Sequence, residues 1–139
     1  MKKPLKKILF ICTGNSCRSQ MAEGWVRELK GDILEPHSAG IEKHGVDPRA
    51  VKVMSEVGID ISRGYSKLIS ELKEKDFDYV VTICNNANKK CPLFSGHAKR
   101  LHHGFDDPAI LSLGVESEEE ILDIYRLVRD EIKDFVVSF

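Results

Sequence analysis

The segment from Cys12 to Ser19 combines a nucleophile with an anion-binding group at a spacing that suits chemistry on a phosphate-like oxyanion. It reads Cys-Thr-Gly-Asn-Ser-Cys-Arg-Ser and follows the apolar run 8–11. A thiol and an arginine separated by five residues, placed between a strand and a helix, form an anion cradle with a nucleophile at its base. We therefore expect an enzyme that reacts through the sulfur of Cys12.

Each residue type in this loop has a chemical reason. Gly14 permits unusual backbone angles, and inward-pointing amides at a helix N-terminus favour a tetrahedral oxyanion. The guanidinium of Arg18 binds two oxygens at once, and the same positive environment stabilises the Cys12 thiolate. Ser19 is placed to donate a hydrogen bond to that sulfur, whereas Cys17 is expected to be a packed thiol at the helix start. The predicted oxyanion-binding residues are Thr13, Gly14, Asn15, Ser16, Cys17, Arg18 and Ser19.

The elements that must position this loop alternate between strand-like and helix-like patterns. We expect strands at 7–11, 33–38, 79–83 and 100–103, and helices at 19–29, 50–57 and 66–72. Asp47 and Pro48 predict an N-cap and first residue of a helix, and Ser117 with Glu120 has capping-box spacing before a last helix. The predicted buried face of that last helix is Ile121, Ile124, Leu127, Val128, Ile132 and Phe135.

This alternation predicts an α/β fold, a three-layer sandwich with a central four-stranded parallel sheet and helices on both faces. We expect a single domain over residues 1–139. Ligands in such folds bind beyond the carboxyl ends of the strands. Because Cys12 follows the first strand and Cys84 follows the third, we expect both on the same rim.

Composition narrows the class of protein. The net charge is −1, which provides no strong field for nucleic acid, and the short basic cluster Lys2–Lys7 is interrupted by Pro4. No apolar stretch approaches the ~20 residues that span a bilayer, and no signal peptide is recognisable. We therefore expect a cytoplasmic monomer without a nucleic-acid or membrane partner. Four cysteines in such a chain are more often catalytic, metal-binding or inert than permanent disulfides.

The loop resembles the signature loop of low-molecular-weight protein tyrosine phosphatases, and the wider pattern resembles thioredoxin-coupled arsenate reductases, which share that fold. The segments that carry the resemblance are FICTGNSCRSQMAEGW at 10–25, SAGIE at 38–42, VVTIC at 80–84, CP at 91–92 and GFDDP at 104–108. They span nearly the whole chain. The loop specifies only the superfamily, and the pair Cys84 and Cys91 specifies the reductase.

The segment Asp106-Asp107-Pro108 supplies the candidate general acid. A leaving oxygen needs a proton, which a carboxyl on a loop can supply. Proline restrains the preceding residue to an extended conformation, which aims Asp107 inward. An Asp-Pro pair by itself is usually a turn, but the resemblance implies that Asp107 is the acid. Asp106 is expected to be a solvated or capping neighbour.

Cys84 and Cys91 leave three interpretations open: inert thiols, zinc ligands or a redox relay. No CxxC pair or recognised histidine spacing supports zinc. For a relay, positions seven apart on a helix lie roughly 10 Å apart, whereas a disulfide requires Cα atoms within about 7 Å. The segment between them must therefore unwind, and its three asparagines and Pro92 suit that demand.

The resemblance implies a mechanism. Cys12 attacks arsenate, Asp107 protonates the departing oxygen, Cys84 then attacks Cys12, and Cys91 finally attacks Cys84, so that thioredoxin reduces an exposed Cys84–Cys91 disulfide. Arg18 binds the oxyanion throughout. The competing interpretations are a tyrosine phosphatase that hydrolyses a phosphocysteine intermediate and a non-catalytic phosphate-binding or redox-sensing module.

The resemblance also raises the question of a cofactor. Relatives often hold potassium beside the loop, at positions that match Asn15, Glu23 and Ser38 here. The carboxylate that relatives add is replaced by Lys67, whose ammonium is expected to occupy the cation's position and pair with Glu23. We therefore expect no metal or other cofactor. His37 and His44 receive no predicted role.

Overall fold

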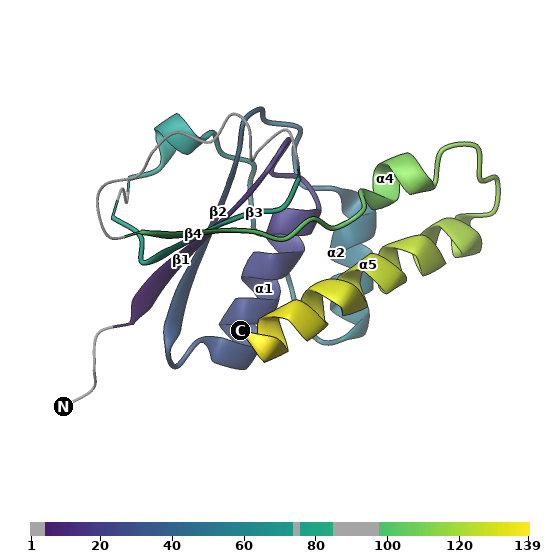
Figure 1. Cartoon of the computed structure of the whole chain (residues 1–139). Coiled ribbons are helices and arrows are strands. Elements are labelled where there is room, and N and C mark those ends of the chain that lie inside the picture. Colours follow the sequence, from purple (N-terminus) through teal and green to yellow (C-terminus); the bar gives the residue numbers. More distant parts are fainter. Residues whose placement is uncertain (1–4, 74–75, 85–97) are drawn as a thin grey trace.

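The computed structural model describes residues 5–73, 76–84 and 98–139. A four-stranded parallel sheet with the order β2-β1-β3-β4 forms its centre (Figure 1). The strands are β1 (Lys6–Cys12), β2 (Leu34–Gly40), β3 (Tyr79–Thr82) and β4 (Lys99–His102). The helices are α1 (Arg18–Lys30), α2 (Pro48–Glu56), α4 (Pro108–Leu111) and α5 (Glu118–Ser138), together with the 3₁₀ helix η1 (Ile69–Glu71). The predicted parallel α/β fold is confirmed.

The two faces of the sheet carry separate apolar clusters because successive residues of a strand point to opposite sides. Ile8 and Phe10 of β1 belong to the larger cluster, which α1, α2 and α5 complete. Leu9 and Ile11 point the other way, into a smaller cluster with apolar residues from the segment 69–80. Figure 1 shows α1, α2 and α5 gathered on one face and η1 on the other. This arrangement leaves the carboxyl end of β1 free to carry a site.

The predicted helix at 66–72 is wrong in extent. Only Ile69–Glu71 is helical, as one 3₁₀ turn. The residues before it join the sheet instead: Leu68 bridges to Gly40 in parallel, and the Gly40 N–H donates to the Lys67 carbonyl at 2.7 Å. Pairing with the end of β2 therefore outweighs helix formation in this segment.

The helix starts follow the predicted capping chemistry. Asp47 is the N-cap of α2, its carboxylate accepts a hydrogen bond from the Arg49 N–H at 2.9 Å, and Pro48 is the first helical residue. Ser117 is the N-cap of α5, where its hydroxyl accepts from the Glu120 N–H at 3.4 Å. Each cap satisfies a backbone donor that the helix itself leaves unpaired.

The predicted buried face of α5 is partly wrong. Leu127 is 59% exposed, whereas Tyr125 and Leu122 are buried. The buried residues of the helix are Ile121, Leu122, Tyr125, Val128, Arg129, Ile132 and Val136. Tyr125 and Arg129 carry polar groups but belong to the buried face of the helix. The buried face is therefore rotated away from Leu127. None of the described helices, α5 included, is long and apolar enough to cross a membrane.

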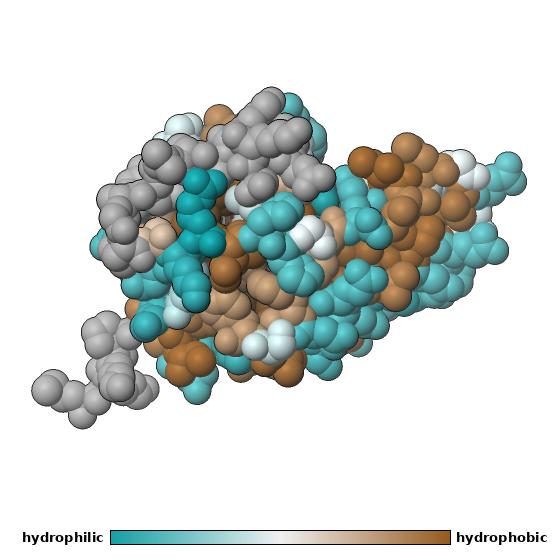
Figure 2. Space-filling model, in the orientation of Figure 1, coloured by the Kyte–Doolittle hydropathy of each residue, from teal (hydrophilic) through white to brown (hydrophobic). Residues whose placement is uncertain are grey.

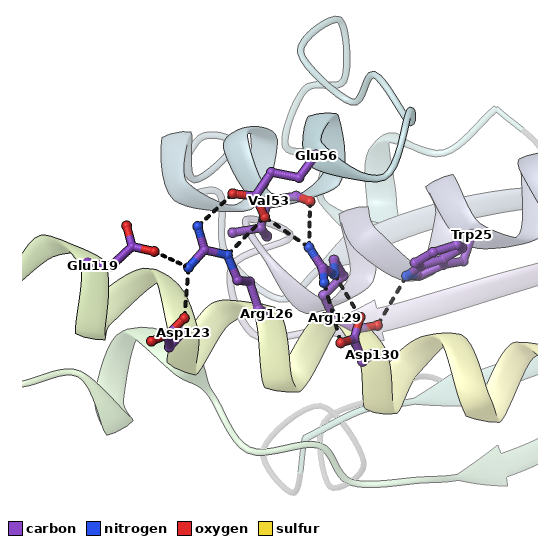
Figure 3. A network of polar contacts seen from close by, with 8 residues as sticks. All are labelled: Trp25, Val53, Glu56, Glu119, Asp123, Arg126, Arg129 and Asp130. Carbon is purple, nitrogen blue, oxygen red and sulfur yellow. Dashed lines mark hydrogen bonds and ion pairs between the residues drawn. The ribbon is translucent and has the colours of Figure 1, made fainter.

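An ion-pair network joins α2 to α5 (Figure 3). Glu56 of α2 accepts from Arg126 at 2.7 Å and from Arg129 at 3.1 Å. Arg129 also donates to the Val53 carbonyl at 3.0 Å, and the Trp25 indole donates to the Arg129 carbonyl at 3.1 Å. The network thereby ties α1, α2 and α5 into one layer against the sheet.

Candidate active site

A cavity of about 780 Å³ opens at the carboxyl ends of β1 and β3. The loop after β1, Cys84 and the segment 104–111 line it. Cys12 is the last residue of β1, and Cys84 lies two residues beyond the end of β3. The predicted meeting of these two cysteines at one rim is confirmed, because both line the same cavity.

The sulfur of Cys12 is buried and receives a directed hydrogen bond. The Ser19 Oγ lies 2.9 Å from the Cys12 Sγ, and the Asn15 side-chain amide donates to the same Oγ at 2.8 Å. Because Ser19 accepts from Asn15, its own hydroxyl hydrogen is free to point at the sulfur. The Ser19 hydroxyl is therefore placed to donate to the sulfur, as the sequence analysis expects.

The unusual backbone angle of the loop lies at Asn15, with φ of 47°, rather than at Gly14. Asparagine tolerates this left-handed conformation better than most residues. Its carbonyl accepts from Gln20 at 3.1 Å and from Ser66 at 2.8 Å, and its Oδ1 accepts from the Lys67 N–H at 2.9 Å. The segment after α2 therefore fixes the turn that aims the loop.

Gly14 serves a steric purpose that the sequence analysis missed. A Cβ at this position would lie 2.3 Å from the Nδ1 of His44, so the imidazole packs directly on the glycine. His44 also lines the cavity, and its Nε2 lies 2.7 Å from a carboxylate oxygen of Glu42. His44 thus belongs to the site although it received no predicted role, and no spacing in the sequence marks it.

Gly40, at the end of β2, packs against the backbone of the loop. A Cβ on Gly40 would lie 2.7 Å from the Asn15 nitrogen, 2.9 Å from the Thr13 oxygen and 2.6 Å from the Glu42 oxygen. The Glu42 N–H donates to the same Thr13 oxygen at 2.8 Å. The end of β2 therefore supports the loop through closely packed main chain.

Arg18 and Asp107 form an ion pair among the residues that line the cavity. The Arg18 guanidinium donates to the Phe105 carbonyl at 2.9 Å and lies 3.5 Å from the Asp107 carboxylate. Asp107 is also the N-cap of α4, where it accepts from the Ala109 N–H at 3.0 Å. The same carboxylate therefore caps a helix and borders the cavity, and its role as the general acid stays a prediction. Asp106 also lines the cavity.

Cys84 is held beside the loop by Thr13. The Thr13 Oγ1 lies 3.0 Å from the Cys84 Sγ, and this places a second sulfur at the wall of the cavity that contains Cys12. Cys91 lies outside the described residues, as does the segment 85–90 that joins it to Cys84. The expected rearrangement of that segment stays a prediction.

Cys17 is buried at the N-cap of α1, as a packed thiol would be. Burial raises the pKa of Cys17, and the carboxylates of Asp47 and Asp107 raise it further. Asp47 is a site residue that the sequence analysis took only as a helix cap. The Tyr125 hydroxyl donates to its carboxylate at 2.6 Å, a contact that no local pattern predicts.

The positions that match a potassium site in relatives are already hydrogen-bonded here. Ser38 donates to Glu23 at 3.3 Å, and the Lys67 ammonium donates to the Tyr65 carbonyl at 3.1 Å. The expected Lys67–Glu23 ion pair does not form between these described residues, because Glu23 pairs with Arg27 at 3.7 Å. Burial lowers the pKa of Lys67, which the charge of Glu23 opposes. Within the described residues, no group of three or more His, Cys, Asp or Glu side chains could hold a metal ion.

One side of the cavity is apolar. Ile110 and Leu111 of α4 line it and are exposed, and Leu113 follows with 76% of its surface exposed. Figure 2 shows the apolar surface over α4 at this end of the molecule. The cavity therefore has a polar floor for an anion and an apolar outer wall.

The site thus combines a thiol, an arginine and a carboxylate at the end of a parallel sheet, and comparison with known families shows which class of protein this is. The chain belongs to the low molecular weight phosphotyrosine protein phosphatase family, whose model matches residues 7–138. An arsenate reductase of Bacillus subtilis (strain 168) is 51% identical over 134 residues, which cover 96% of this chain and 94% of that protein. The family and the fold predicted from the sequence are thereby confirmed.

Solved structures agree with this placement. An arsenate reductase in the oxidized state matches with a TM-score of 0.79 and 32% identity, over 96% of this chain and 95% of that chain. The thioredoxin-dependent arsenate reductase of Corynebacterium glutamicum matches with a TM-score of 0.66 and 26% identity, over 99% of this chain and 63% of that chain. The fold is therefore shared with reductases as well as with the phosphatases that name the family.

Proposed function

We propose that this protein reduces arsenate to arsenite through a relay of three cysteines. The observation that carries the proposal is the Cys84 sulfur, which Thr13 holds at 3.0 Å on the wall of the cavity that contains Cys12. A phosphocysteine needs only water to complete its reaction, whereas reduction needs a second thiol within reach. The names of the relatives support the same activity.

The first step uses the loop as an anion site. Arsenate has the shape and charge of phosphate, so the amides of residues 13–19 and the Arg18 guanidinium bind its oxygens. The Cys12 thiolate attacks arsenic, and Asp107 donates a proton to the departing oxygen, which leaves as water. The Asp107 carboxylate lies 3.5 Å from the Arg18 guanidinium and lines the same cavity as Cys12, which supports this role.

The second step transfers two electrons. The Cys84 thiolate attacks the Cys12 sulfur, the sulfur–arsenic bond breaks with its electron pair on arsenic, and arsenite leaves behind a Cys12–Cys84 disulfide. Cys91 then attacks Cys84 and releases the Cys12 thiolate. A dithiol protein, which we take to be thioredoxin, reduces the Cys84–Cys91 disulfide and supplies the two electrons. The reductase of Corynebacterium glutamicum is described as thioredoxin-dependent, which supports this donor.

Replacing the relay cysteines separates reduction from hydrolysis. Cys84→Ser and Cys91→Ser should abolish multiple-turnover arsenite formation with thioredoxin, because each breaks the path of electrons out of the site. Both should retain most hydrolysis of an aryl phosphate, which uses only Cys12, Arg18 and Asp107. Disulfide mapping of the wild-type protein after one turnover should find Cys84 joined to Cys91. Equal loss of both activities would overturn the relay.

Hydrolysis of phosphomonoesters is the second candidate function, and the family description favours it. There Cys12 forms a phosphocysteine and Asp107 activates water. The apolar wall at Ile110 and Leu111 would suit an aryl group. If thioredoxin and arsenate give no arsenite while aryl phosphate turns over rapidly, this second function is the correct one.

We further propose that the protein works without potassium, as a cytoplasmic monomer. The Asn15 Oδ1 and the Ser38 hydroxyl are engaged in protein hydrogen bonds, and Lys67 brings a cation of its own to this region. Melting temperatures in matched potassium and sodium chloride should therefore agree within error, and a rise specific to potassium would contradict the proposal. Gel filtration should give the mass of one chain.

A further inference from the structure

The anion-binding loop contains two buried thiols, and the proposed function uses only Cys12 as the nucleophile. Cys12 and Cys17 both line the cavity, with 3% and 6% of their surfaces exposed. Cys17 occupies the N-cap of α1, where the positive end of a helix normally favours a thiolate. Position alone would therefore activate Cys17 as well, so another feature must keep it inert.

Burial is the largest cause of the raised pKa of Cys17, and the carboxylate of Asp47 is the next largest. Asp47 lines the same cavity, and its backbone N–H donates at 3.0 Å to the carbonyl of Ser16, the residue before Cys17. Both oxygens of its side chain are held: Oδ1 accepts from the Arg49 N–H at 2.9 Å and Oδ2 accepts from the Tyr125 hydroxyl at 2.6 Å. The negative charge is therefore tied to the loop and cannot swing away.

Tyr125 reaches Asp47 from α5, which packs beside α2 (Figure 1). Its ring is almost fully buried, with 1% of the residue exposed. Burial and the Asp47 carboxylate raise the pKa of Tyr125, so its hydroxyl stays protonated and donates. A buried hydroxyl that donates to a carboxylate forms a short, charge-assisted hydrogen bond, which is stronger than one between neutral groups.

We propose that Asp47 and Tyr125 are positioning residues that select Cys12 over Cys17 as the reacting thiol of the loop. Tyr125 anchors the Asp47 carboxylate, and the carboxylate opposes a second negative charge at Cys17. Cys17 is faced by Asp47 at the start of α2, by Asp107 at the start of α4, and by Cys12 and Arg18 of the loop. Of these, only Arg18 favours a thiolate there, whereas Cys12 has the Ser19 hydroxyl as a donor.

Alkylation of the reduced full-length chain by iodoacetamide tests this selection without arsenate or an electron donor, so its outcome is independent of the proposed function. The rate of labelling at Cys17 is followed from pH 6 to pH 10 by peptide mass spectrometry. Asp47→Asn keeps an N-cap acceptor but removes the charge. Tyr125→Phe removes one hydroxyl from a ring that stays buried. Tyr79→Phe, at the far end of β3, is the matched control.

We expect Asp47→Asn to shift the Cys17 labelling profile to lower pH, with a rate at pH 8 about fivefold above wild type, because a neighbouring negative charge is lost. Tyr125→Phe should shift it in the same direction by about twofold, since the carboxylate is then less firmly held. Tyr79→Phe should match wild type. Melting temperatures are measured in parallel. If both site variants melt lower but keep the wild-type Cys17 profile, the pair is merely structural and the proposal is overturned.

Discussion

Asp107 combines an observed structural role with the proposed role of general acid. Its carboxylate caps α4 through the Ala109 N–H and also faces the Arg18 guanidinium. A cap needs only an acceptor oxygen, whereas a general acid needs a proton that it can release. A substitution that keeps the acceptor and removes the acid therefore separates the two roles.

Asp107→Asn should fold with a melting temperature close to that of wild type, because asparagine caps helices as well as aspartate does. Its kcat for arsenate reduction and for aryl phosphate hydrolysis should fall by about 100-fold or more, in line with the loss of a general acid. Steady-state kinetics and thermal unfolding of the same preparations check this. A drop in activity that is matched by a drop in stability would point to the cap alone.

At the residue scale, the sequence indicated the groups whose chemistry is local. Cys12 and Arg18 were predicted from residue type and short spacing and Asp107 from the family resemblance, and the structure brings all three to one cavity. His44, Asp47 and Tyr125 were missed as site residues because their roles arise from contacts between distant segments. The left-handed angle was assigned to Gly14 on propensity, but hydrogen bonds from three other residues place it at Asn15.

At the scale of elements, local patterns predicted helix starts better than helix faces. The caps at Asp47 and Ser117 rest on interactions within three residues, which the sequence displays directly. The face of α5 depends instead on what the neighbouring elements offer, and α2 offers Glu56 and the Val53 carbonyl to Arg129. A buried arginine with such partners takes a place that periodicity assigns to an apolar residue.

Glu56→Gln tests the contribution of this network to stability. Hydrogen bonds from Arg126 are the largest cause of the lowered pKa of Glu56, so the folded state binds its proton less readily than the unfolded chain does. The stabilisation is therefore complete above the ordinary value of 4.5 and is lost as the pH falls through the lower folded value. At pH 7 the variant should lose about 1 kcal/mol, the upper range for a partly exposed pair.

Urea unfolding at pH 7 and at pH 3 measures this effect, with Glu116→Gln, an exposed carboxylate, as the control. The difference between wild type and Glu56→Gln should shrink at the lower pH, whereas Glu116→Gln should track wild type at both. A difference that is unchanged by pH would mean that the lost stability comes from packing and not from the charge.

At the scale of the whole molecule, the parallel sheet explains why segments far apart in sequence share one site. The strands β1 and β3 run in the same direction, so Cys12 and Cys84 lie at the same edge of the sheet. Thr13, the residue after Cys12, contacts Cys84 although the two are 71 positions apart in the sequence. The sequence predicted this edge from strand order alone. The sequence did not predict that the face of the sheet opposite α1 is covered by so little helix. There the segment that contains η1 pairs with the sheet instead of forming a longer helix.

Inorganic phosphate should stabilise the whole fold through this site. At a phosphate concentration ten times the Kd, linkage gives about 1.4 kcal/mol of added stability. Arg18→Lys keeps a positive charge but loses the planar fork that grips two oxygens, so most of this gain should disappear. The measurement is the melting temperature at increasing phosphate concentration, compared with sodium chloride of equal ionic strength and without sulfate. An equal gain in both proteins would show that phosphate acts elsewhere.

The crowding at Gly40 has a practical consequence for anyone who wishes to redesign the pocket. The three nearest atoms that a new methyl group would meet there belong to the main chain, so a change of rotamer could not relieve these overlaps. The cavity wall at Ile110 and Leu111 consists instead of exposed side chains, where substitution meets less steric constraint. To admit bulkier anions, a redesign should therefore replace Ile110 or Leu111 with smaller residues and keep Gly40.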